Sequence, residues 1–529
     1  MISCKNPILN GFYPDPSICR VGEWFYLVNS TFAYYPGIPI FRSRNLAQWE
    51  QIGNVLTRES QVPLRGSGHN EGIYAPTIRW HEGTFYIITT NVAGGGNFIV
   101  TAKDPAGPWS EPYFLEEAEG IDPSLFFDDD GSCYYIGQRQ NSDGSRYFGD
   151  CEIWIRKLNP ETFELEGEAH PVLYGFQKNA VWPEGPHLYK RNGYYYILHA
   201  ESGTEQYHCE VAARSRNIFG PYEYARTNPI LTHRHLGSRA EITCVGHCDL
   251  TEDQAGNWYM VVLGCRPQDG KTFRGRETFL AKVEWEDDWP VVNPGIGMIQ
   301  KEVELPGEKD TLMPESLSES REYLFKDLQE KQLPPEFLML RNPDTDAYVL
   351  DNECLMLPAK AVTLKDKATP SYVALRQTSA QFLAETEFTL KGQPKDRAGI
   401  AYIQNDQNYL CVEYEEDESY GRVYVTACIG GENKILVERK TEIRLCQNLR
   451  LIVNKNCAEA WLKKGDIWEC VLEDMDISYM CTESTGGFTG CTVGMYTHAR
   501  EKQSSGYTKF YRFVLTTVAR IPSPLYVMG

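Results

Sequence analysis

Hydrophobic and polar positions in the first 300 residues follow one recurring pattern. A turn with glycine leads into a segment rich in Tyr, Phe and Trp. These segments are GEWFYLV from Gly22, GTFYII from Gly83, GSCYYIG from Gly131, GYYYIL from Gly193 and GNWYMVV from Gly256. Aromatic and β-branched residues favour strands, and glycine favours turns. The pattern predicts a series of β-hairpins, with little helix.

A shorter segment precedes each aromatic strand by a similar interval. These segments are PDPSI (14–18), YAPTI (74–78), IDPSLF (121–126), WPEGPHL (182–188) and VGHCDL (245–250). A unit of about 50–60 residues has the size of a four-stranded propeller blade, and such self-similarity is typical of radial repeats. Five copies predict an all-β fold that begins with a five-bladed β-propeller. A β-sandwich with irregular insertions is the alternative.

Polar residues lead these shorter segments. The first strand of each blade lines the propeller axis, so equivalent positions converge there; we align Asp15, Ala75, Asp122, Glu184 and His247. Three carboxylates and a histidine would then share one channel mouth, an arrangement that repulsion makes costly unless it serves chemistry or binds a cation. A lone aspartate before Pro-Ser would more simply form a turn. Two such stretches in register, with a glutamate in a third copy, favour a shared site.

The repeated sequence pattern ends near residue 300. The segment 301–322, KEVELPGEKDTLMPESLSESRE, is polar and acidic, as expected for a connector. Short alternating segments such as YVALRQ, AGIAYIQ and YLCVEY follow, separated by turn residues, and predict a β-sandwich. We therefore expect a propeller domain at 1–300, a connector at 301–322 and a sandwich domain at 323–529.

The amino-acid composition argues against some classes of binding partner. The chain has 52 Lys and Arg against 72 Asp and Glu, a net charge of -20. This balance argues against nucleic acid or an anionic membrane, because either needs a basic footprint. The N-terminal MISCKNPILNGF has no apolar stretch typical of an export signal, and the 16 cysteines form no CxxC pair. We expect thiols rather than disulfides, and a cytoplasmic location.

The predicted cluster fits the cleavage of a glycosidic bond. That reaction needs two carboxyl groups of unequal proton affinity: one protonates the leaving oxygen, and the other activates water or attacks as nucleophile. A third carboxylate nearby can raise the pKa of the acid. Spacing alone neither assigns these roles nor chooses between inversion and retention.

Several blocks of the sequence resemble signature segments of glycoside hydrolase family 43, above all its two-domain β-xylosidases and α-L-arabinofuranosidases. The blocks are NGFYPDPSICRVGEWFYLVNSTF, GIYAPTIRW, GIDPSLFFDDDG, WPEGPHLYK and GRETFLAKVEWED. The resemblance implies that Asp15 is the general base, that Glu184 is the general acid, and that Asp122 raises the pKa of Glu184 and positions it. It also implies inversion, with the base and acid about 6.5–9.5 Å apart.

The resemblance extends to residues that would bind the sugar. Arg276, in GRET, matches an arginine that hydrogen-bonds sugar hydroxyls, and Phe32 matches an aromatic wall of the same subsite. Tyr74 stands where many relatives have Trp, which alters the stacking surface, and Thr204 falls at a pocket-lining position. His247 matches an axial histidine that reaches a calcium ion in some members, so calcium at the axis is an expectation, although the chemistry itself requires no cofactor.

The second half carries a resemblance of its own. TPSYVALRQTSAQFLAETEF and DRAGIAYIQNDQNYL resemble the concanavalin-A-like C-terminal domain of these xylosidases. In some relatives a loop of that domain closes one side of the pocket, which favours exo cleavage. A domain that only stabilises the propeller or forms a homo-oligomer interface is the simpler interpretation.

These observations predict an exo-glycosidase that acts on a small oligosaccharide. We expect it to remove terminal β-D-xylosyl residues from xylo-oligosaccharides, and α-L-arabinofuranosyl groups are a further candidate substrate, because the two pentoses offer similar hydroxyl geometry. Two alternatives remain at this stage. An endo-acting arabinanase would need an open cleft, and a non-catalytic carbohydrate-binding protein would keep the aromatic walls but could dispense with one acid.

Overall fold

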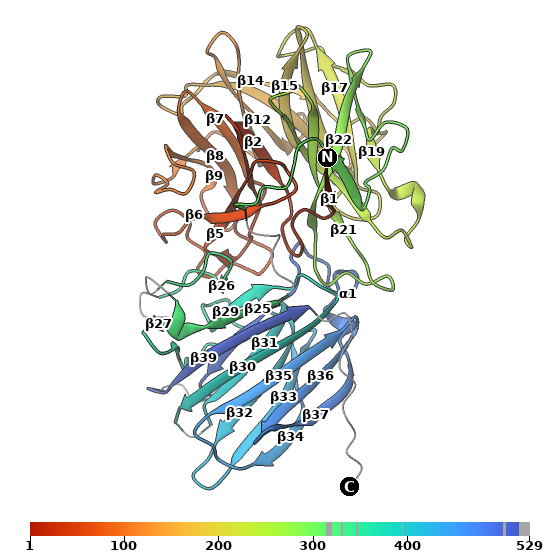
Figure 1. Cartoon of the computed structure of the whole chain (residues 1–529). Coiled ribbons are helices and arrows are strands. Elements are labelled where there is room, and N and C mark those ends of the chain that lie inside the picture. The colour runs from red at the N-terminus through yellow and green to blue at the C-terminus, as the bar shows by residue number, and fades with distance from the viewer. Residues whose placement is uncertain (314–319, 329–331, 345–347, 394, 501–503, 518–529) are drawn as a thin grey trace. The chain divides into compact units, whose positions relative to one another are not determined.

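The chain is all-β, with helices limited to single turns among the described residues (Figure 1). The computed structural model describes residues 1–313, 320–328, 332–344, 348–393, 395–500 and 504–517. Two compact units make up the chain: Met1–Gly270 with Gly275–Ser316, here unit 1, and Lys271–Arg274 with Leu317–Gly529, here unit 2. Parts of the predicted connector (314–319) and of the predicted second domain (329–331, 345–347, 394, 501–503 and 518–529) lie outside the described residues.

Among its described residues, unit 1 contains five antiparallel sheets of four or five strands, and the strands of each sheet come from one continuous stretch of the chain. The first has β2 (Ser17–Val21), β3 (Trp24–Val28), β5 (Gly37–Ser43) and β6 (Glu50–Leu56). The second has β7 (Thr77–His81), β8 (Thr84–Asn91), β9 (Gly96–Ala102) and β10 (Tyr113–Phe114). The third has β11 (Ile121–Phe127), β12 (Cys133–Gln140), β13 (Cys151–Leu158) and β14 (Leu165–Leu173).

The two remaining sheets of unit 1 complete the series. The fourth has β15 (Glu184–Arg191), β16 (Tyr194–Glu201), β17 (Cys209–Ser215) and β18 (Glu223–Tyr224), and β19 (Leu231–Thr232) also pairs with β17. The fifth has β20 (Thr243–Glu252), β21 (Trp258–Cys265), β22 (Glu277–Glu286) and β23 (Trp289–Val292). Outside these sheets, β1 (Ile2–Lys5) pairs with β24 (Glu302–Leu305), and β4 (Tyr34–Tyr35) and the single-turn η1 (Arg234–Leu236) are short.

Each predicted glycine turn joins the first strand of a sheet to its second strand. The five glycines have φ between 60° and 85°: Gly22, Gly83, Gly131, Gly193 and Gly256. Glycine adopts this left-handed backbone without the steric cost that a Cβ brings. The predicted hairpins are therefore confirmed, because the tight turn and the aromatic strand after it are both local properties of the sequence.

Buried hydrophobic clusters lie between neighbouring sheets of unit 1. They join Ile88 to Leu125, Ile136 to Ile197, Leu198 to Val262, and Val261 to Leu27. The first and second sheets meet through the rings of Tyr26 and Phe85, whose centroids are 5.0 Å apart. Because the fifth sheet also packs against the first, the series of sheets closes on itself, and the first strands face one another at its centre.

Unit 2 contains two larger antiparallel sheets. One has β27 (Val349–Leu350), β28 (Leu355–Pro358), β39 (Tyr507–Thr517), β30 (Gln381–Lys391), β35 (Gln447–Asn454), β36 (Cys457–Lys464) and β37 (Ile467–Asp476), and β25 (Ser320–Leu324) pairs with β39. The other has β29 (Ser371–Arg376), β38 (Thr492–His498), β31 (Arg397–Asn405), β32 (Asn408–Glu416), β33 (Gly421–Ile429) and β34 (Glu432–Thr441).

The two sheets of unit 2 pack face to face. Phe382 on β30 and Tyr402 on β31 bring their ring centroids within 5.5 Å across the interface, and both side chains are buried. The remaining elements of this unit are short: η2 (Phe325–Asp327), β26 (Met339–Leu340), η4 (Ser478–Met480) and α1 (Thr482–Thr485). The layered arrangement agrees with the predicted sandwich.

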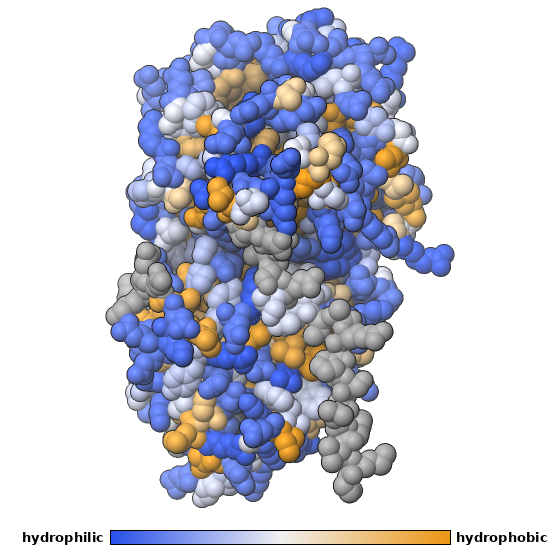
Figure 2. Space-filling view, viewed as in Figure 1, coloured by the Kyte–Doolittle hydropathy of each residue, from blue (hydrophilic) through white to orange (hydrophobic). Residues whose placement is uncertain are grey.

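Hydrophilic residues cover most of the face that Figure 2 shows, and hydrophobic residues appear there in small separate groups. This agrees with the acidic composition. Within the described part of the chain, no helix has the length and apolar character required to cross a lipid bilayer.

Candidate active site

Four of the five first strands carry a residue with left-handed backbone near their start. Asp15, Asp122, Gly185 and His247 have φ of 51°, 54°, 59° and 56°. At the last three of these positions the strand pairing is interrupted, as in a β-bulge. Bulges re-aim side chains, and left-handed backbone at non-glycine residues is costly and concentrates at functional sites. The fold thus turns these residues toward the centre of unit 1.

This backbone geometry corrects the sequence alignment of the fourth repeat by one residue. The alignment paired Glu184 with Asp15, Asp122 and His247, whereas the left-handed position in the fourth sheet is Gly185. A Cβ at Gly185 would lie 2.7 Å from Nε2 of His247, so this position must lack a side chain. Glu184, one residue earlier, supplies the carboxyl group instead.

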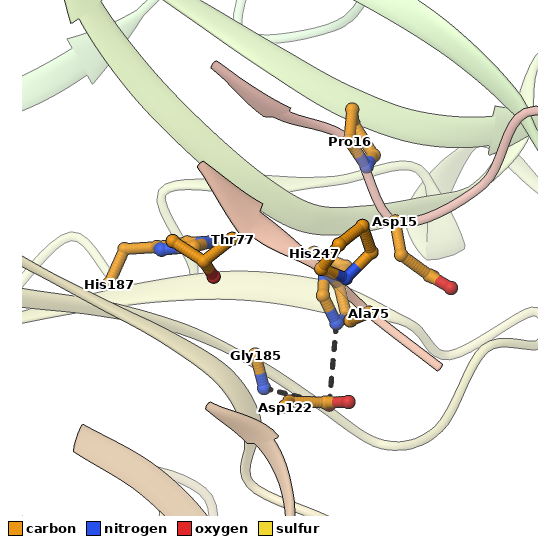
Figure 3. A pocket seen from close by; sticks show the side chains of 9 residues that line it. Asp15, Pro16, Ala75, Thr77, Asp122, Gly185, His187 and His247 are labelled. Carbon is orange, nitrogen blue, oxygen red and sulfur yellow. Dashed lines mark hydrogen bonds and ion pairs between the residues drawn. The ribbon is translucent and has the colours of Figure 1, made fainter. Parts of the chain in front are cut away.

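The first strands surround one narrow pocket (Figure 3). Its lining residues are Asp15, Pro16, Ala75, Pro76, Thr77, Asp122, Gly185, His187 and His247. In Figure 3 the Asp122 carboxylate accepts two contacts through Oδ2, from the backbone N–H of Gly185 at 3.1 Å and from Nε2 of His247 at 3.4 Å. Asp122 therefore ties the third, fourth and fifth sheets together at the pocket.

Asp15 is held as a carboxylate. Nη1 of Arg276 donates to its Oδ1 at 2.6 Å, and the hydroxyl of Ser30 donates to its Oδ2. Burial acts to raise the pKa of Asp15, but the charges of Arg276 and His247 and the Ser30 hydrogen bond outweigh it, and the pKa lies below its usual value. A buried carboxylate that stays ionised can accept a proton from water.

Glu184 differs from Asp15 in that its pKa is raised. Burial raises its pKa most, the negative charges of Asp122 and Asp15 add to this rise, and His247 and Arg276 oppose it, so that the pKa is about 8. Glu184 has no hydrogen bond or ion pair from its carboxyl group to any other described residue. At neutral pH it therefore carries a proton that it can donate.

His247 supplies a positive charge beside these acids. Burial alone would lower the pKa of its imidazole, but Asp122, Asp15 and Glu184 raise it to about 9. His247 is 4% exposed, so its imidazole has little contact with solvent. A charged imidazole next to Asp122 offsets the repulsion that three neighbouring carboxyl groups would otherwise suffer.

The residues predicted to contact sugar form one wall, apart from Thr204. The ring centroids of Phe32 and Tyr74 are 5.2 Å apart, and the guanidinium carbon of Arg276 lies 5.7 Å from the Phe32 centroid. Electrostatic interaction places Tyr74 near both Asp122 and Asp15, and burial is the main cause that raises its pKa to about 12. The described contacts of Thr204 include none with this wall or with the acids, so its role stays a prediction.

A polar network adjoins the pocket, formed by residues that lie two or four positions further along the first strands. Asp249 accepts hydrogen bonds from Ser17 at 2.6 Å, from Arg79 at 2.8 Å and from the hydroxyl of Tyr189 at 2.6 Å. Arg79 also contacts Nδ1 of His187 at 3.0 Å. Side chains from several sheets are thus fixed around the fully buried carboxylate of Asp249.

The predicted calcium ligand, His247, has a protein partner in this arrangement. Its Nε2 lies 3.4 Å from the Asp122 carboxylate. Among the residues described here, no group of three or more His, Cys, Asp or Glu side chains is arranged to hold a metal. None of the steps proposed below uses a metal, and calcium at the axis stays a prediction.

Sequence reasoning missed several residues of the site. Ser30 and the Asp249 network were not singled out, although Ser17, Thr77, Ser124, His187 and Asp249 share one position in the repeat. That shared position, two residues after the left-handed one, was the available signal. Correct alignment of Gly185 would have revealed it.

Asp15, an ionised carboxylate, and Glu184, a protonated carboxyl group, interact electrostatically, and such a pair can perform acid–base hydrolysis. Comparison with known proteins specifies the family. Residues 4–290 match the family model described as glycosyl hydrolases family 43, and residues 326–516 match the model of the beta xylosidase C-terminal concanavalin A-like domain. The chain belongs to glycosyl hydrolase family 43 and is a glycoside hydrolase with a concanavalin-like C-terminal domain.

Three relatives illustrate the similarity along the whole chain. A xylosidase/arabinosidase of Butyrivibrio fibrisolvens is 46% identical over 535 residues, which cover 98% of this chain and 100% of that protein. A non-reducing end alpha-L-arabinofuranosidase of Bacteroides ovatus is 33% identical over 512 residues, covering 93% and 90%. The crystal structure of a xylan beta-1,4-xylosidase from Bacillus halodurans superimposes with a TM-score of 0.89 at 30% identity, covering 97% of this chain and 100% of that one.

Proposed function

We propose that this chain is an inverting exo-glycosidase that removes terminal β-D-xylosyl residues from xylo-oligosaccharides and also accepts α-L-arabinofuranosides. The single observation that carries the mechanism is the opposite ionisation of Asp15 and Glu184, two carboxyl groups close enough to interact electrostatically. The names of the relatives support both pentoses as substrates.

The proposed roles follow from these charges. Glu184 protonates the glycosidic oxygen as the bond to the leaving group breaks. Asp15 removes a proton from the water that attacks the anomeric carbon from the other side, and the configuration inverts. Asp122 raises the pKa of Glu184, so that the acid still holds its proton at neutral pH. Phe32, Tyr74 and Arg276 form the wall against which the sugar lies.

We also propose that the five sheets of unit 1 are the blades of a β-propeller, with the domain boundaries predicted above. The closure of the fifth sheet on the first supports this arrangement. A cytoplasmic location agrees with the sixteen cysteines, which form no disulfide among the described residues. The expected partner is a small neutral oligosaccharide, and a homo-oligomer is a further candidate state of the protein.

Hydrolysis of p-nitrophenyl β-D-xylopyranoside, p-nitrophenyl α-L-arabinofuranoside and xylobiose tests the proposed activity. We expect cleavage of the xyloside and of xylobiose, with β-xylosides yielding α-xylose as the first product by NMR. Failure to cleave any of the three would refute the substrate class. Release of oligomers from linear arabinan, with no monosaccharide, would favour an endo-acting arabinanase instead.

Treatment with a chelator tests whether hydrolysis depends on a bound calcium ion. The proposed mechanism expects unchanged kcat after dialysis against EDTA. A loss that calcium restores would show that the activity depends on a calcium ion.

A further inference from the structure

The strand that carries His247 is distorted on both sides of that residue. Pairing of β20 with β21 shifts register between Thr243 and Gly246 and again between Gly246 and Cys248. Cys244 and His247 have φ of 59° and 56°, which is a costly backbone for side chains with a Cβ. Such a conformation persists only where surrounding contacts hold it, so the contacts of the segment 244–248 are informative.

Two buried side chains of the neighbouring sheet hold the two ends of this bulged segment. Nδ1 of His208 lies 2.9 Å from the carbonyl oxygen of Cys244, and because a carbonyl only accepts, Nδ1 carries the hydrogen. Oε2 of Glu210 accepts from the backbone N–H of Cys248 at 3.1 Å. Both side chains are fully buried, His208 directly before β17 and Glu210 within it.

The His208 ring packs closely against the backbone of β20 at Gly246. A Cβ at Gly246 would lie 2.6 Å from the His208 ring, so the glycine lets the strand pass beneath the imidazole. Burial lowers the pKa of His208 to about 3, and the ring is neutral at physiological pH. His208 therefore acts as a fixed hydrogen-bond donor and not as a charge.

Glu210 acts as a fixed acceptor. Burial raises its pKa to about 8, against the opposing effects of the His247 charge and of the backbone N–H groups of Cys248 and His247. Its Oε1 has no hydrogen-bond partner among the described residues. A buried acid with no role in the proposed proton transfers, placed beside the residue that faces Asp122, requires another explanation.

We propose that His208 and Glu210 are positioning residues that hold the bulge of β20 and so keep the His247 imidazole against Asp122 and Gly185. This inference rests on the catalytic roles proposed above. It predicts that His208 and Glu210 act on catalysis through His247. Since the His247 cation lowers the pKa of both Asp15 and Glu184, its displacement changes the pH dependence of the reaction.

Displacement of the His247 cation moves the pH profile in one direction. The charged or titratable groups around His247 are Asp15 with its partner Arg276, Asp122, Glu184, Glu210, His187 and His208. When the His247 cation moves away, Asp15 and Glu184 lose a favourable charge and become weaker acids. Both limbs of the profile of kcat/KM against pH then move to higher pH.

Glu210→Leu and Glu210→Gln form the test pair. Leucine removes the acceptor, whereas the glutamine amide oxygen still accepts from Cys248. We expect Glu210→Leu to lower kcat/KM by about 10–100-fold, as loss of an outer-shell partner does in metal sites. We also expect it to shift the acidic and alkaline limbs of the kcat/KM profile to higher pH. Glu210→Gln is expected to keep the wild-type limbs. Equal limbs in wild type and Glu210→Leu, at reduced activity, would overturn the proposal, because a merely structural role lowers activity at every pH.

A double-mutant cycle with His247→Gln measures the coupling between Glu210 and His247. If Glu210 acts through His247, Glu210→Leu has little further effect in the His247→Gln background. Additive losses would overturn the inference. Should Glu210→Leu fail to fold, His208→Leu, with His208→Asn as the variant that keeps a donor, enters the same cycle.

NMR of the imidazole nitrogens gives a readout that needs no substrate, and so separates this inference from the proposed activity. We expect the His247 ring to titrate near pH 9 in wild type and Glu210→Gln, and closer to the ordinary value of about 6.5 in Glu210→Leu. An unchanged His247 titration in Glu210→Leu would overturn the positioning role, whatever the enzyme hydrolyses.

Discussion

The guanidinium of Arg276 donates from Nη1 to Oδ1 of Asp15 across 2.6 Å, although the two residues lie 261 positions apart in the sequence. Both side chains are buried, and this pair keeps Asp15 ionised where burial alone would favour its neutral form. Glu184 has no comparable cation bonded to it among the described residues. The difference between the two acids therefore originates in what the fold places beside each.

Removal of either acid should abolish most turnover. We expect Asp15→Ala and Glu184→Ala each to lower kcat by about 10²–10⁴-fold, the usual contribution of general acid–base catalysis. The measurement is initial-rate kinetics on the aryl xyloside. Asp466→Asn and Glu205→Gln, at exposed acids, serve as controls and should keep wild-type rates. Near-wild-type turnover in both alanine variants would exclude the assigned roles.

The alkaline limb of kcat/KM should follow Glu184. Because this acid must be protonated, activity is expected to fall as pH rises through about 8. The negative charge of Asp122 raises the pKa of Glu184, so Asp122→Asn should move the alkaline limb to lower pH. Measurement of kcat/KM from pH 5 to 10 in both proteins checks this. A limb that stays in place would show that Asp122 does not tune the acid.

Gly185→Ala should damage the site, whereas Gly22→Ala should not. The two glycines have nearly the same φ, 59° and 60°, so both alanine variants bear a similar backbone cost of about 1–2 kcal/mol. Only at Gly185 would the new Cβ meet another group, the imidazole of His247 at 2.7 Å; at Gly22 no heavy atom lies within 4 Å.

We expect Gly185→Ala to lower kcat/KM by about 10²-fold, as a misplacement of 1 Å does, and Gly22→Ala to lower only the thermal stability. Parallel assays and melting curves of the two variants make the comparison. Equal activity in both would show that the position of His247 is not critical.

Arg79→Met should destabilise the protein strongly. It leaves Asp249 as a buried carboxylate without its cation, and such a break costs about 3–5 kcal/mol in the free energy of unfolding. Arg156→Met is the matched control: both arginine side chains are 16% exposed, but Glu117, the partner of Arg156, is largely exposed. That pair contributes about 0–1 kcal/mol.

The Arg79–Asp249 ion pair predicts that the stability of the protein depends on pH. Burial opposes ionisation of Asp249, but Arg79, His187 and the Ser17 hydroxyl lower its pKa to about 2. A group whose pKa is depressed by folding stabilises the native state above its unfolded value and loses that effect as pH falls through the folded value. Urea unfolding of wild type should therefore lose stability between about pH 4 and 2. A flat profile there would contradict the assignment.

The order of elements could be predicted from the sequence because it depends on local chemistry. Glycine turns such as Gly83 and Gly193 and the aromatic strands after them follow from backbone and side-chain preferences over a few residues. The repeat also singled out Asp15 and Asp122, since each stands in the same short motif.

The repeat alone misaligned the fourth copy, because WPEGPHL offers two candidate residues. The left-handed backbone of Gly185, and the His247 ring that leaves no space for a Cβ there, decide between them.

The sequence by itself determined which residues repeat, where the chain turns, and that three acids occupy related places. The tertiary structure decided the ionisation of those acids and the support of His247, through Arg276 beside Asp15 and through His208 and Glu210 behind the bulge. The physical reason is the separation along the chain over which each kind of interaction acts. Turn and strand preferences act between chain neighbours, whereas charge pairing and burial depend on groups that only the packed sheets bring together.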